Sequence, residues 1–366
     1  MRRVVLVTAH YFESKRKAGF HWLADAYWRD GWEVFFFTGY ISWLSWLYRD
    51  YRFAYPIFQE AGKVRKIKER LASYVWLTPW HPAHLRSNFL NHIVGHWYWH
   101  YGDLPLGEIE PYLKDASLFI IDSTSVLLLF DRFKRLNPLA RYVYRVSDDL
   151  RYCRMHPVAS QAEESYAPRF DLVSVPSEAL LRKFANLSTA RLHPHGLNKD
   201  LFDRPYQNPY PHKVVNVVFV GTLLDLDFLE RASRLFPEWC FHIVGPVSGL
   251  PERSNVIAYG ELPFSQTIPY IKFADIGIWA LNYETGREAG NNSLKIIQYT
   301  YCRLPIVVPE FLRSGRSNMF YYRAGDDASI RDAFLKAAKC DRTAISTTDI
   351  ASWDDVARAL SGIQNG

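Results

Sequence analysis

The chain has 366 residues, of which 48% are hydrophobic and 22% are charged, so it is a globular protein and not a disordered one. Its net charge of +6 suits an anionic partner: nucleic acid, an acidic membrane surface or a phosphorylated small molecule. The four cysteines are scattered and form no CxxC pair, so the sequence gives no sign of a zinc site. Their distribution suits a protein in a reducing compartment. No apolar run reaches the ~18 residues of a membrane-spanning helix, so we expect a cytoplasmic protein.

The first half alternates buried strands with helices, a pattern typical of a parallel sheet that is covered on both faces. Strands are expected at 2–10, 32–39, 73–79, 116–123, 141–149 and 171–177. Helices are expected at Phe20–Arg29 and Val126–Leu136.

The same alternation restarts after a connection rich in Pro, Asn and His at 192–213. Strands are expected at 214–222, 240–245, 255–260, 276–281 and 304–309, with helices at 225–237, 266–272, 293–301 and 349–363. The pattern predicts an α/β protein with two lobes, whose parallel sheets face a central cleft. We expect an N-terminal domain at 1–192, a linker at 193–213, a C-terminal domain at 214–345 and, at 346–366, a helix that packs back on the first domain.

Carboxylates stand at the ends of two strands in the first half. Ser147, Asp148 and Asp149 follow one strand, and Asp122 ends another. A carboxylate there could remove a proton from an incoming hydroxyl, although adjacent acids also occur in solvated turns. His10 and the short basic run that contains Lys15 and Arg16 follow the first strand, and could bind phosphate or face solvent.

Polar groups also follow strands in the second half. Gly221 would let a phosphate or base approach the backbone, and Glu261 could accept hydrogen bonds from ribose hydroxyls. The pair Asp225 and Asp227 imitates a metal-binding motif, but an acid belongs at a helix start here, with Asp227 as the cap or first-turn acid. No metal is expected.

The stretch from Asn291 to Pro309 begins a helix with more hydrogen-bonding groups than one cap needs. Asn292, Ser293 and Lys295 could converge on a diphosphate, because a helix N-terminus favours an anion. Gln298 lies one turn beyond Lys295. An ordinary capped amphipathic helix is the alternative, but this segment and Glu261 together indicate a nucleotide site.

Tryptophans and basic residues are interleaved between 39 and 102. This composition fits an anionic bilayer surface, where aromatic rings sit at headgroup level, but an aromatic core with a basic outer face would look similar. The residues concerned are Trp43, Trp46, Trp76, Trp80, Trp97, Trp99, Lys63, Arg65, Lys66, Lys68, Arg70 and Arg86.

At this point the chain resembles a known family. The segments YRVSDDL, HPHGLN, VGTLLDLDF, FHIVG and NNSLKIIQY are similar to the membrane-associated glucuronosyltransferase of xanthan biosynthesis, glycosyltransferase family seventy. The similarity covers nearly the whole chain in the same order. It implies a GT-B fold with two Rossmann-like lobes. It also implies inverting, metal-independent transfer from a UDP-sugar to a polyprenyl-diphosphate-linked glycan at the inner face of the bacterial plasma membrane.

The resemblance also implies roles for individual residues. Asp148 matches the family's catalytic base, and Glu261 matches the acid that binds the uridine ribose. Ser293, Lys295 and Gln298 match the diphosphate and donor contacts. Some positions differ in side chain from the family: Leu223 and Leu294 stand where it has methionines. Asn292 replaces a serine, and Tyr283 lies two residues beyond the family's tyrosine.

Two other functions remain open from the residues alone. A UDP-sugar epimerase on a GT-B-like scaffold would need further acid/base groups at the sugar. A basic, aromatic nucleic-acid binder would bind oligonucleotides in a salt-sensitive way, but no RNP or KH motif is present, so we expect no nucleic-acid partner. The resemblance favours the glycosyltransferase, which needs a UDP-sugar as substrate and no cofactor.

Overall fold

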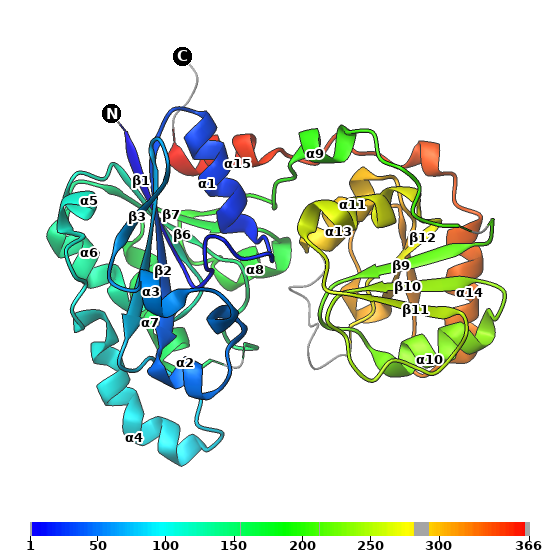
Figure 1. The fold of residues 1–366 in the computed structure, drawn as a ribbon, viewed down its shortest axis with the longest axis horizontal. Helices are drawn as coiled ribbons and strands as arrows, with labels where there is room; N and C mark the ends of the chain where they lie inside the picture. The colour runs from blue at the N-terminus through cyan, green and yellow to red at the C-terminus, as the bar shows by residue number, and fades with distance from the viewer. Residues whose placement is uncertain (1, 154, 212, 282–292, 363–366) are drawn as a thin grey trace. The chain divides into compact units, whose positions relative to one another are not determined.

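The computed structural model describes residues 2–153, 155–211, 213–281 and 293–362. The chain divides into two compact units (Figure 1). The first comprises Met1–His193 and Trp353–Gly366, and the second comprises Pro194–Ser352.

The first unit is built on an eight-stranded sheet with the order β3-β4-β2-β1-β5-β6-β7-β8. All pairs are parallel except β3–β4, which is antiparallel. The strands are β1 (Arg3–Thr8), β2 (Glu33–Ser42), β3 (Val64–Lys68), β4 (Leu71–Thr78), β5 (Leu118–Asp122), β6 (Arg141–Arg145), β7 (Leu172–Val175) and β8 (Ala190–Leu192). The basic segment around Lys66 is thus the edge strand β3, which the sequence analysis did not identify as a strand.

Helices surround this sheet. The α-helices are α1 (Gly19–Arg29), α2 (Trp43–Leu47), α3 (Ile57–Glu60), α4 (Asn88–Trp99), α5 (Glu110–Lys114), α6 (Phe130–Leu136), α7 (Val158–Tyr166), α8 (Glu178–Lys183) and α15 (Trp353–Ser361). Shorter 3-10 turns are η1 (Tyr51–Ala54), η2 (His100–Asp103), η3 (Ser125–Leu129) and η4 (Ala167–Arg169). The helix expected at 126–136 is therefore η3 followed by α6.

The last helix, α15, packs on α1. The Tyr27 hydroxyl donates to the carbonyl of Ala357 at 2.8 Å, and the Trp353 ring lies against Gly19, where a Cβ would approach it to 3.0 Å. Val356 and Leu360 are buried beside α1. The end of the chain is therefore part of the core of the first unit.

The second unit holds a six-stranded parallel sheet with the order β11-β10-β9-β12-β13-β14. Its strands are β9 (Asn216–Val220), β10 (Cys240–Val244), β11 (Val256–Gly260), β12 (Ile276–Ile278), β13 (Ile306–Pro309) and β14 (Met319–Tyr322). Its helices are α9 (Lys199–Asp203), α10 (Leu226–Leu235), α11 (Phe264–Phe273), α13 (Leu294–Tyr301) and α14 (Asp327–Ala338), with turns η6 (Glu310–Leu312) and η7 (Arg342–Ala344).

Strand β9 shows why its sequence is a continuous apolar run. Val217 and Phe219 pack with the residues of α10 and α14, whereas Val218 and Val220 pack with those of α11 and α13. Both faces of the sheet are covered, so every residue of the strand must be apolar or otherwise satisfied.

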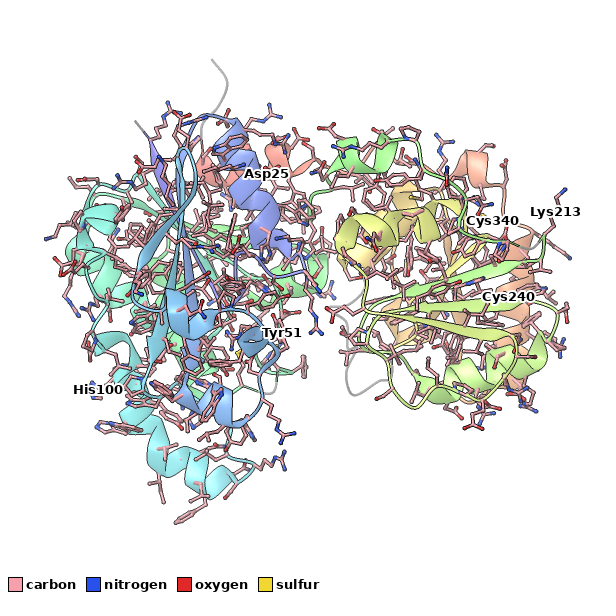
Figure 2. The ribbon with its side chains drawn as sticks, viewed as in Figure 1. Asp25, Tyr51, His100, Lys213, Cys240 and Cys340 are labelled. Atoms are coloured by element: carbon pink, nitrogen blue, oxygen red, sulfur yellow. The ribbon has the colours of Figure 1, made fainter. Side chains whose placement is uncertain are left out.

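The cysteines are free thiols. Cys240 on β10 and Cys340 after α14 are both in the second unit (Figure 2), and Cys153 and Cys302 are also unpaired by disulfides. Each is half-buried, as expected for small apolar residues.

Candidate active site

The carboxyl ends of β1, β5 and β6 lie side by side, and Asp122 joins them. Its Oδ2 accepts from Thr8 Oγ1 at 2.7 Å, and its Oδ1 accepts from Ser147 Oγ at 2.8 Å. The backbone N–H of Ser123 also donates to Oδ1, at 2.9 Å. Asp122 is 2% exposed, so three donors satisfy a buried carboxylate.

Asp148 differs from Asp122 in both surroundings and partners. Among the described residues its carboxylate has no hydrogen-bond or ion-pair partner, and the residue is exposed to solvent. Protein atoms packed around the carboxylate nevertheless displace part of its water, and this desolvation, helped by the negative charge of Asp122, raises the pKa of Asp148 to about 6. A carboxylate with a raised pKa and a free lone pair is suited to general base catalysis near neutral pH.

Asp149 is already engaged. It is 6% exposed, and its carboxylate accepts hydrogen bonds from Arg151 Nη2 at 2.6 Å and from Lys183 Nζ at 2.9 Å. Burial favours a higher pKa, but the hydrogen bonds from Arg151 and Lys183 outweigh it and lower the pKa of Asp149 to about 2. The same lysine also pairs with the buried Glu163. Asp149 therefore anchors the turn after β6 to α7 and α8.

His10 stands beside this cluster at the end of β1. Its backbone N–H donates to Thr8 Oγ1 at 3.3 Å, and burial, partly opposed by the charge of Asp122, lowers the pKa of its imidazole. Lys15 and Arg16 lie farther along the same loop: Lys15 is exposed, and the guanidinium of Arg16 stands 4.5 Å from the centroid of the Tyr51 ring.

Glycines mark the carboxyl ends of three neighbouring strands in the second unit. Gly221 follows β9, Gly245 follows β10, and Gly260 ends β11 with a positive φ of 66°. A Cβ on Gly245 would stand 1.8 Å from the carbonyl oxygen of Gly221, so the two backbones approach each other too closely for any side chain. Gly245 must therefore be glycine, and a Cβ on Gly221 would itself stand 2.8 Å from the Phe219 ring.

Helix α13 is held against the end of β9. Tyr299 Oη accepts from the backbone N–H of Val220, the last residue of β9, at 3.0 Å. Ser293 is the N-cap and accepts from the N–H of Ile296. The first N–H groups of the helix and its dipole favour an anion at its N-terminus.

Lys295 supplies a cation in the first turn of α13. Its Nζ donates to Gln298 Oε1 at 3.3 Å, and Gln298 is 3% exposed. Burial lowers the pKa of Lys295 to about 8. The amide of Gln298 thus orients an ammonium group whose protonation changes close to physiological pH.

The other residues that the sequence predicts to bind the UDP-sugar differ in their exposure. Glu261 directly follows β11 and is exposed, Leu223 is 54% exposed, and Leu294 is half-buried. Asn292 and Tyr283 lie outside the described residues.

The aspartates that imitate a metal motif have other partners. Asp225 is the N-cap of α10 and accepts from the N–H of Phe228 at 3.2 Å, and Asp227 pairs with Arg231 at 2.7 Å. Asp227 is therefore the first-turn acid and Asp225 the cap. Among the described residues, no cluster of three or more His, Cys, Asp or Glu could hold a metal ion.

The aromatic region between 39 and 102 divides into core and surface. Trp76 follows the aromatic-core alternative: it is 2% exposed, its Nε1 donates to the carbonyl of Pro105, and it shares the inward face of β4 with Tyr74. Trp99 is partly buried against the core of the first unit. Trp80 is half-buried and contacts Trp97, with ring centroids 4.0 Å apart.

The exposed apolar side chains gather on α2, α3 and α4. They are Trp43, Trp46, Leu47, Tyr48, Phe58, Phe89, Leu90, Ile93 and Trp97, and together they are called the apolar patch here. The basic residues of β3 have other partners: Arg65 pairs with Glu60 and Glu13, and Lys68 Nζ lies over the Trp28 ring. Arg49 and Arg86, which flank α2 and α4, are exposed.

Several residues of these clusters escaped the sequence analysis. Ser123 Oγ accepts from the N–H groups of Ser147 and Asp148, at 2.8 and 3.1 Å. Lys183 is distant in sequence from its partner Asp149. The glycines Gly245 and Gly260 each end a strand in the same way as Gly221, and this repetition was the available signal.

Comparison with known proteins identifies a matching family model for the first half of the chain and a relative for nearly all of it. Residues 6–176 match the model of the N-terminal domain of the glucuronosyltransferase GumK. The chain is 27% identical over 356 residues to the UDP-glucuronate:glycolipid 2-beta-glucuronosyltransferase of Xanthomonas campestris pv. campestris, covering 96% of this chain and 87% of that protein. These matches confirm the resemblance seen in the sequence.

Solved structures with a similar backbone share little sequence. Sucrose-phosphate synthase from Thermosynechococcus elongatus gives a TM-score of 0.68 at 14% identity, covering 99% of this chain and 98% of that chain. An α,α-trehalose-phosphate synthase from Burkholderia xenovorans gives 0.65 at 12%, covering 98% and 100%. At such identities the likeness shows the fold alone, and it confirms the GT-B class.

Proposed function

We propose that this chain, a glycosyltransferase of GT-B fold that is similar to the GumK-type glucuronosyltransferases, transfers glucuronic acid from UDP-glucuronate to a polyprenyl-diphosphate-linked oligosaccharide in bacterial exopolysaccharide synthesis. The observation that carries the chemistry is the carboxylate of Asp148. It is accessible, lacks a partner among the described residues, and stands between two carboxylates that are fully engaged.

Asp148 is the general base of the proposed reaction. It takes the proton from an acceptor hydroxyl while that oxygen attacks the anomeric carbon, and the bond from this carbon to the UDP oxygen breaks. A single displacement of this kind inverts the anomeric configuration. One base is enough, because UDP leaves as an anion and needs charge stabilisation more than a proton.

The departing UDP is stabilised without a metal ion in this proposal. The N–H groups at the start of α13 and the ammonium of Lys295 supply positive charge for the diphosphate. Glu261 accepts hydrogen bonds from the ribose, and Leu223 and Leu294 contribute apolar surface to the nucleotide site. Asp225 and Asp227, whose spacing imitates a metal-binding motif, cap and pair within helix α10.

The apolar patch supports peripheral binding to an anionic membrane surface. No helix in the described part of the chain could cross a bilayer. Phe89, Ile93 and Trp97 recur every four residues on α4 and are each more than half exposed, so one side of this helix presents an apolar stripe to solvent. In Figure 1 α4 projects from the first unit below α2, and Arg49 and Arg86 add positive charge nearby.

Ring contacts hold members of the patch in place. Phe58 packs against Trp43 with 5.0 Å between ring centroids, and Trp97 on α4 packs against Trp80 at 4.0 Å. Such a surface would hold the enzyme at the cytoplasmic face of the plasma membrane. There it would meet its lipid-linked acceptor.

Transfer itself is the test of the proposed function. Purified protein is incubated with UDP-glucuronate, UDP-glucose or UDP alone and with lipid-linked oligosaccharide, and the products are analysed by mass spectrometry and NMR. We expect glucuronosyl transfer with inversion, unchanged by EDTA. Interconversion of UDP-sugars in the absence of acceptor would instead favour an epimerase.

Flotation with vesicles tests the membrane surface. We expect the protein to float with phosphatidylglycerol-containing vesicles, less so in high salt. Phe89→Ser with Ile93→Ser should release it, whereas Leu139→Ser, which removes an apolar side chain that is 96% exposed and lies outside the apolar patch, should not. Equal flotation of both variants would contradict the role of α4.

A further inference from the structure

Asp122 is a buried anion that the proposed reaction does not use. It contacts all three strand ends around the candidate base: Thr8 of β1, Ser123 after β5 and Ser147 after β6. Each contact is a hydrogen bond of 2.7 to 2.9 Å to a carboxylate oxygen. Hydrogen bonds to a charged acceptor are stronger than neutral ones, so this carboxylate fixes the strand ends relative to one another.

Ser123 extends the same framework to Asp148. Its Oγ accepts from the N–H groups of both Ser147 and Asp148. The backbone of the turn is therefore held through Ser123, and its Ser147 hydroxyl is held by Asp122. The Asp148 side chain is the part of this turn that remains without a partner among the described residues.

We propose that Asp122 is a positioning residue for the base, holding the Ser147–Asp148 turn against β1 and β5 while placing a second negative charge beside the Asp148 carboxylate. This inference rests on the proposed function, because it concerns the same carboxylate. A base gains strength when a like charge stands near it, since the charged form becomes less favourable. Asp122 therefore makes Asp148 both well placed and more basic.

The other groups around the pair do not supply this effect. His10, Cys153 and Tyr144 are neutral near pH 7, because burial lowers the pKa of His10 and raises that of Cys153 to about 12 and that of Tyr144 well above its ordinary value. Asp149 is neutralised by its own cations. The titratable and charged groups that surround the two acids are His10, Arg52, Tyr144, Arg145, Asp149, Cys153 and Lys183.

Arg145 is a cation that interacts with Asp122 and whose charge could oppose the effect. It is 2% exposed and donates to Ser174 Oγ and to the carbonyl of His193, both at 2.7 Å. Its pKa, lowered by burial to about 10, leaves it charged at neutral pH. This charge is the same in all variants below, so it does not affect their comparison.

Asp122→Asn removes the negative charge of this side chain and can keep its hydrogen bonds. The asparagine is nearly isosteric: its oxygen can accept from Ser147 and Ser123, and its NH₂ can donate to Thr8 Oγ1. With the like charge removed, Asp148 becomes a stronger acid. The acid limb of the kcat/KM profile should therefore move down by about one pH unit, and kcat above pH 7 should fall several-fold, because the base is weaker.

Ser147→Ala is the matched variant, because it removes the hydrogen bond that Ser147 Oγ donates to Asp122 and keeps both charges. It should lower kcat by about tenfold with an unchanged KM for UDP-glucuronate, and its acid limb should stay in place. If Asp122→Asn does not fold, this variant carries the test of positioning, and an unchanged kcat overturns it.

Carboxyl ¹³C NMR of the full chain keeps this inference separate from the proposed base. Asp148 is assigned by comparison with Asp148→Asn, and its titration is followed in wild type and in Asp122→Asn. A lower midpoint in Asp122→Asn supports the coupling even if Asp148→Asn retains activity and the base assignment fails. An unchanged midpoint in a folded Asp122→Asn protein overturns the inference.

Discussion

Asp148 and Asp149 are neighbours in the chain but have opposite environments. Asp149 is buried in ion pairs with Arg151 and Lys183, whereas the carboxylate of Asp148 has no such partner among the described residues. Their pKa values are accordingly separated, about 2 for Asp149 and about 6 for Asp148. Two carboxylates whose environments push their pKa values apart can serve different purposes, one structural and one chemical.

The first prediction distinguishes these two acids by substitution. Asp148→Asn should reduce transfer by about 10²- to 10⁴-fold, the usual contribution of a general base, and leave UDP binding unchanged. Asp149→Asn should instead lower the free energy of unfolding by about 1–3 kcal/mol, because it weakens buried charge-assisted hydrogen bonds. Steady-state rates, calorimetric UDP titration and urea unfolding measure the three quantities.

The thermal stability of Asp148→Asn provides its control. The folded-state pKa of Asp148 lies above its ordinary value of 3.8, so the ionised form opposes folding at neutral pH. The variant should therefore unfold at or above the wild-type temperature at pH 8. A variant that loses both activity and stability would argue for a structural role of Asp148.

A bell-shaped pH profile is the second prediction. The reaction needs Asp148 ionised and Lys295 protonated, and their pKa values in the free protein are about 6 and about 8. The kcat/KM for UDP-glucuronate should rise through pH 6, reach a plateau near pH 7, and fall above pH 8. Initial rates in constant-ionic-strength buffers from pH 5 to 9.5 provide the profile.

Lys295→Arg tests whether Lys295 is the group whose deprotonation causes the alkaline limb of that profile. Arginine keeps its charge throughout this pH range, so the decline above pH 8 should disappear, whatever the level of the plateau. If the decline persists in Lys295→Arg, another group causes it.

Much of the architecture followed from the sequence because strand periodicity and helix caps are local signals. The continuous apolar run of β9 indicated a sheet covered on both faces, and Ser293 indicated the start of α13. The edge strand β3 was missed because its residues are half-buried and basic, which hides the alternation. Composition left Trp76 open between surface and core, although its alternation with Tyr74 on β4 predicts an inward position.

The sequence predicted where the carboxylates of the candidate site lie, but not which residues they contact. Asp122, Asp148 and Asp149 were all located at strand ends from the sequence. Their differences depend on tertiary contacts: Thr8 reaches Asp122 across 114 positions, and Lys183 reaches Asp149 across 34. No local pattern reports such distant neighbours, so the sequence left two candidate bases open.

The third prediction concerns Lys183, which lies between two acids. Its Nζ bonds to both Asp149 and Glu163, and its side chain is 13% exposed. Lys183→Met leaves these carboxylates without their shared cation, and should cost about 3–5 kcal/mol of unfolding free energy. Glu178→Met on the same helix is exposed and serves as the control, with an effect below about 0.5 kcal/mol.

The ion pairs of Asp149 also have a defined pH dependence. Its folded-state pKa of about 2 lies below the ordinary value, so its stabilisation is complete above about pH 4 and is lost as the pH falls toward 2. The stability difference between wild type and Asp149→Asn should therefore shrink between pH 5 and pH 3. A difference that stays constant over this range would show that the charge of Asp149 is unimportant.

The last prediction separates the diphosphate from the nucleoside. Lys295→Ala should weaken UDP binding by about 10- to 100-fold, because it removes a charge-assisted hydrogen bond of about 1.5–3 kcal/mol, and should change uridine binding by less than about threefold. Gln298→Ala should have a smaller effect in the same direction, since it removes only the acceptor that orients Lys295 Nζ at 3.3 Å. Calorimetric titrations with UDP and uridine measure both ligands. Equal losses of affinity for UDP and uridine in Lys295→Ala would show that the lysine does not contact the diphosphate. The N–H groups at the start of α13 would then be the remaining contact of the diphosphate.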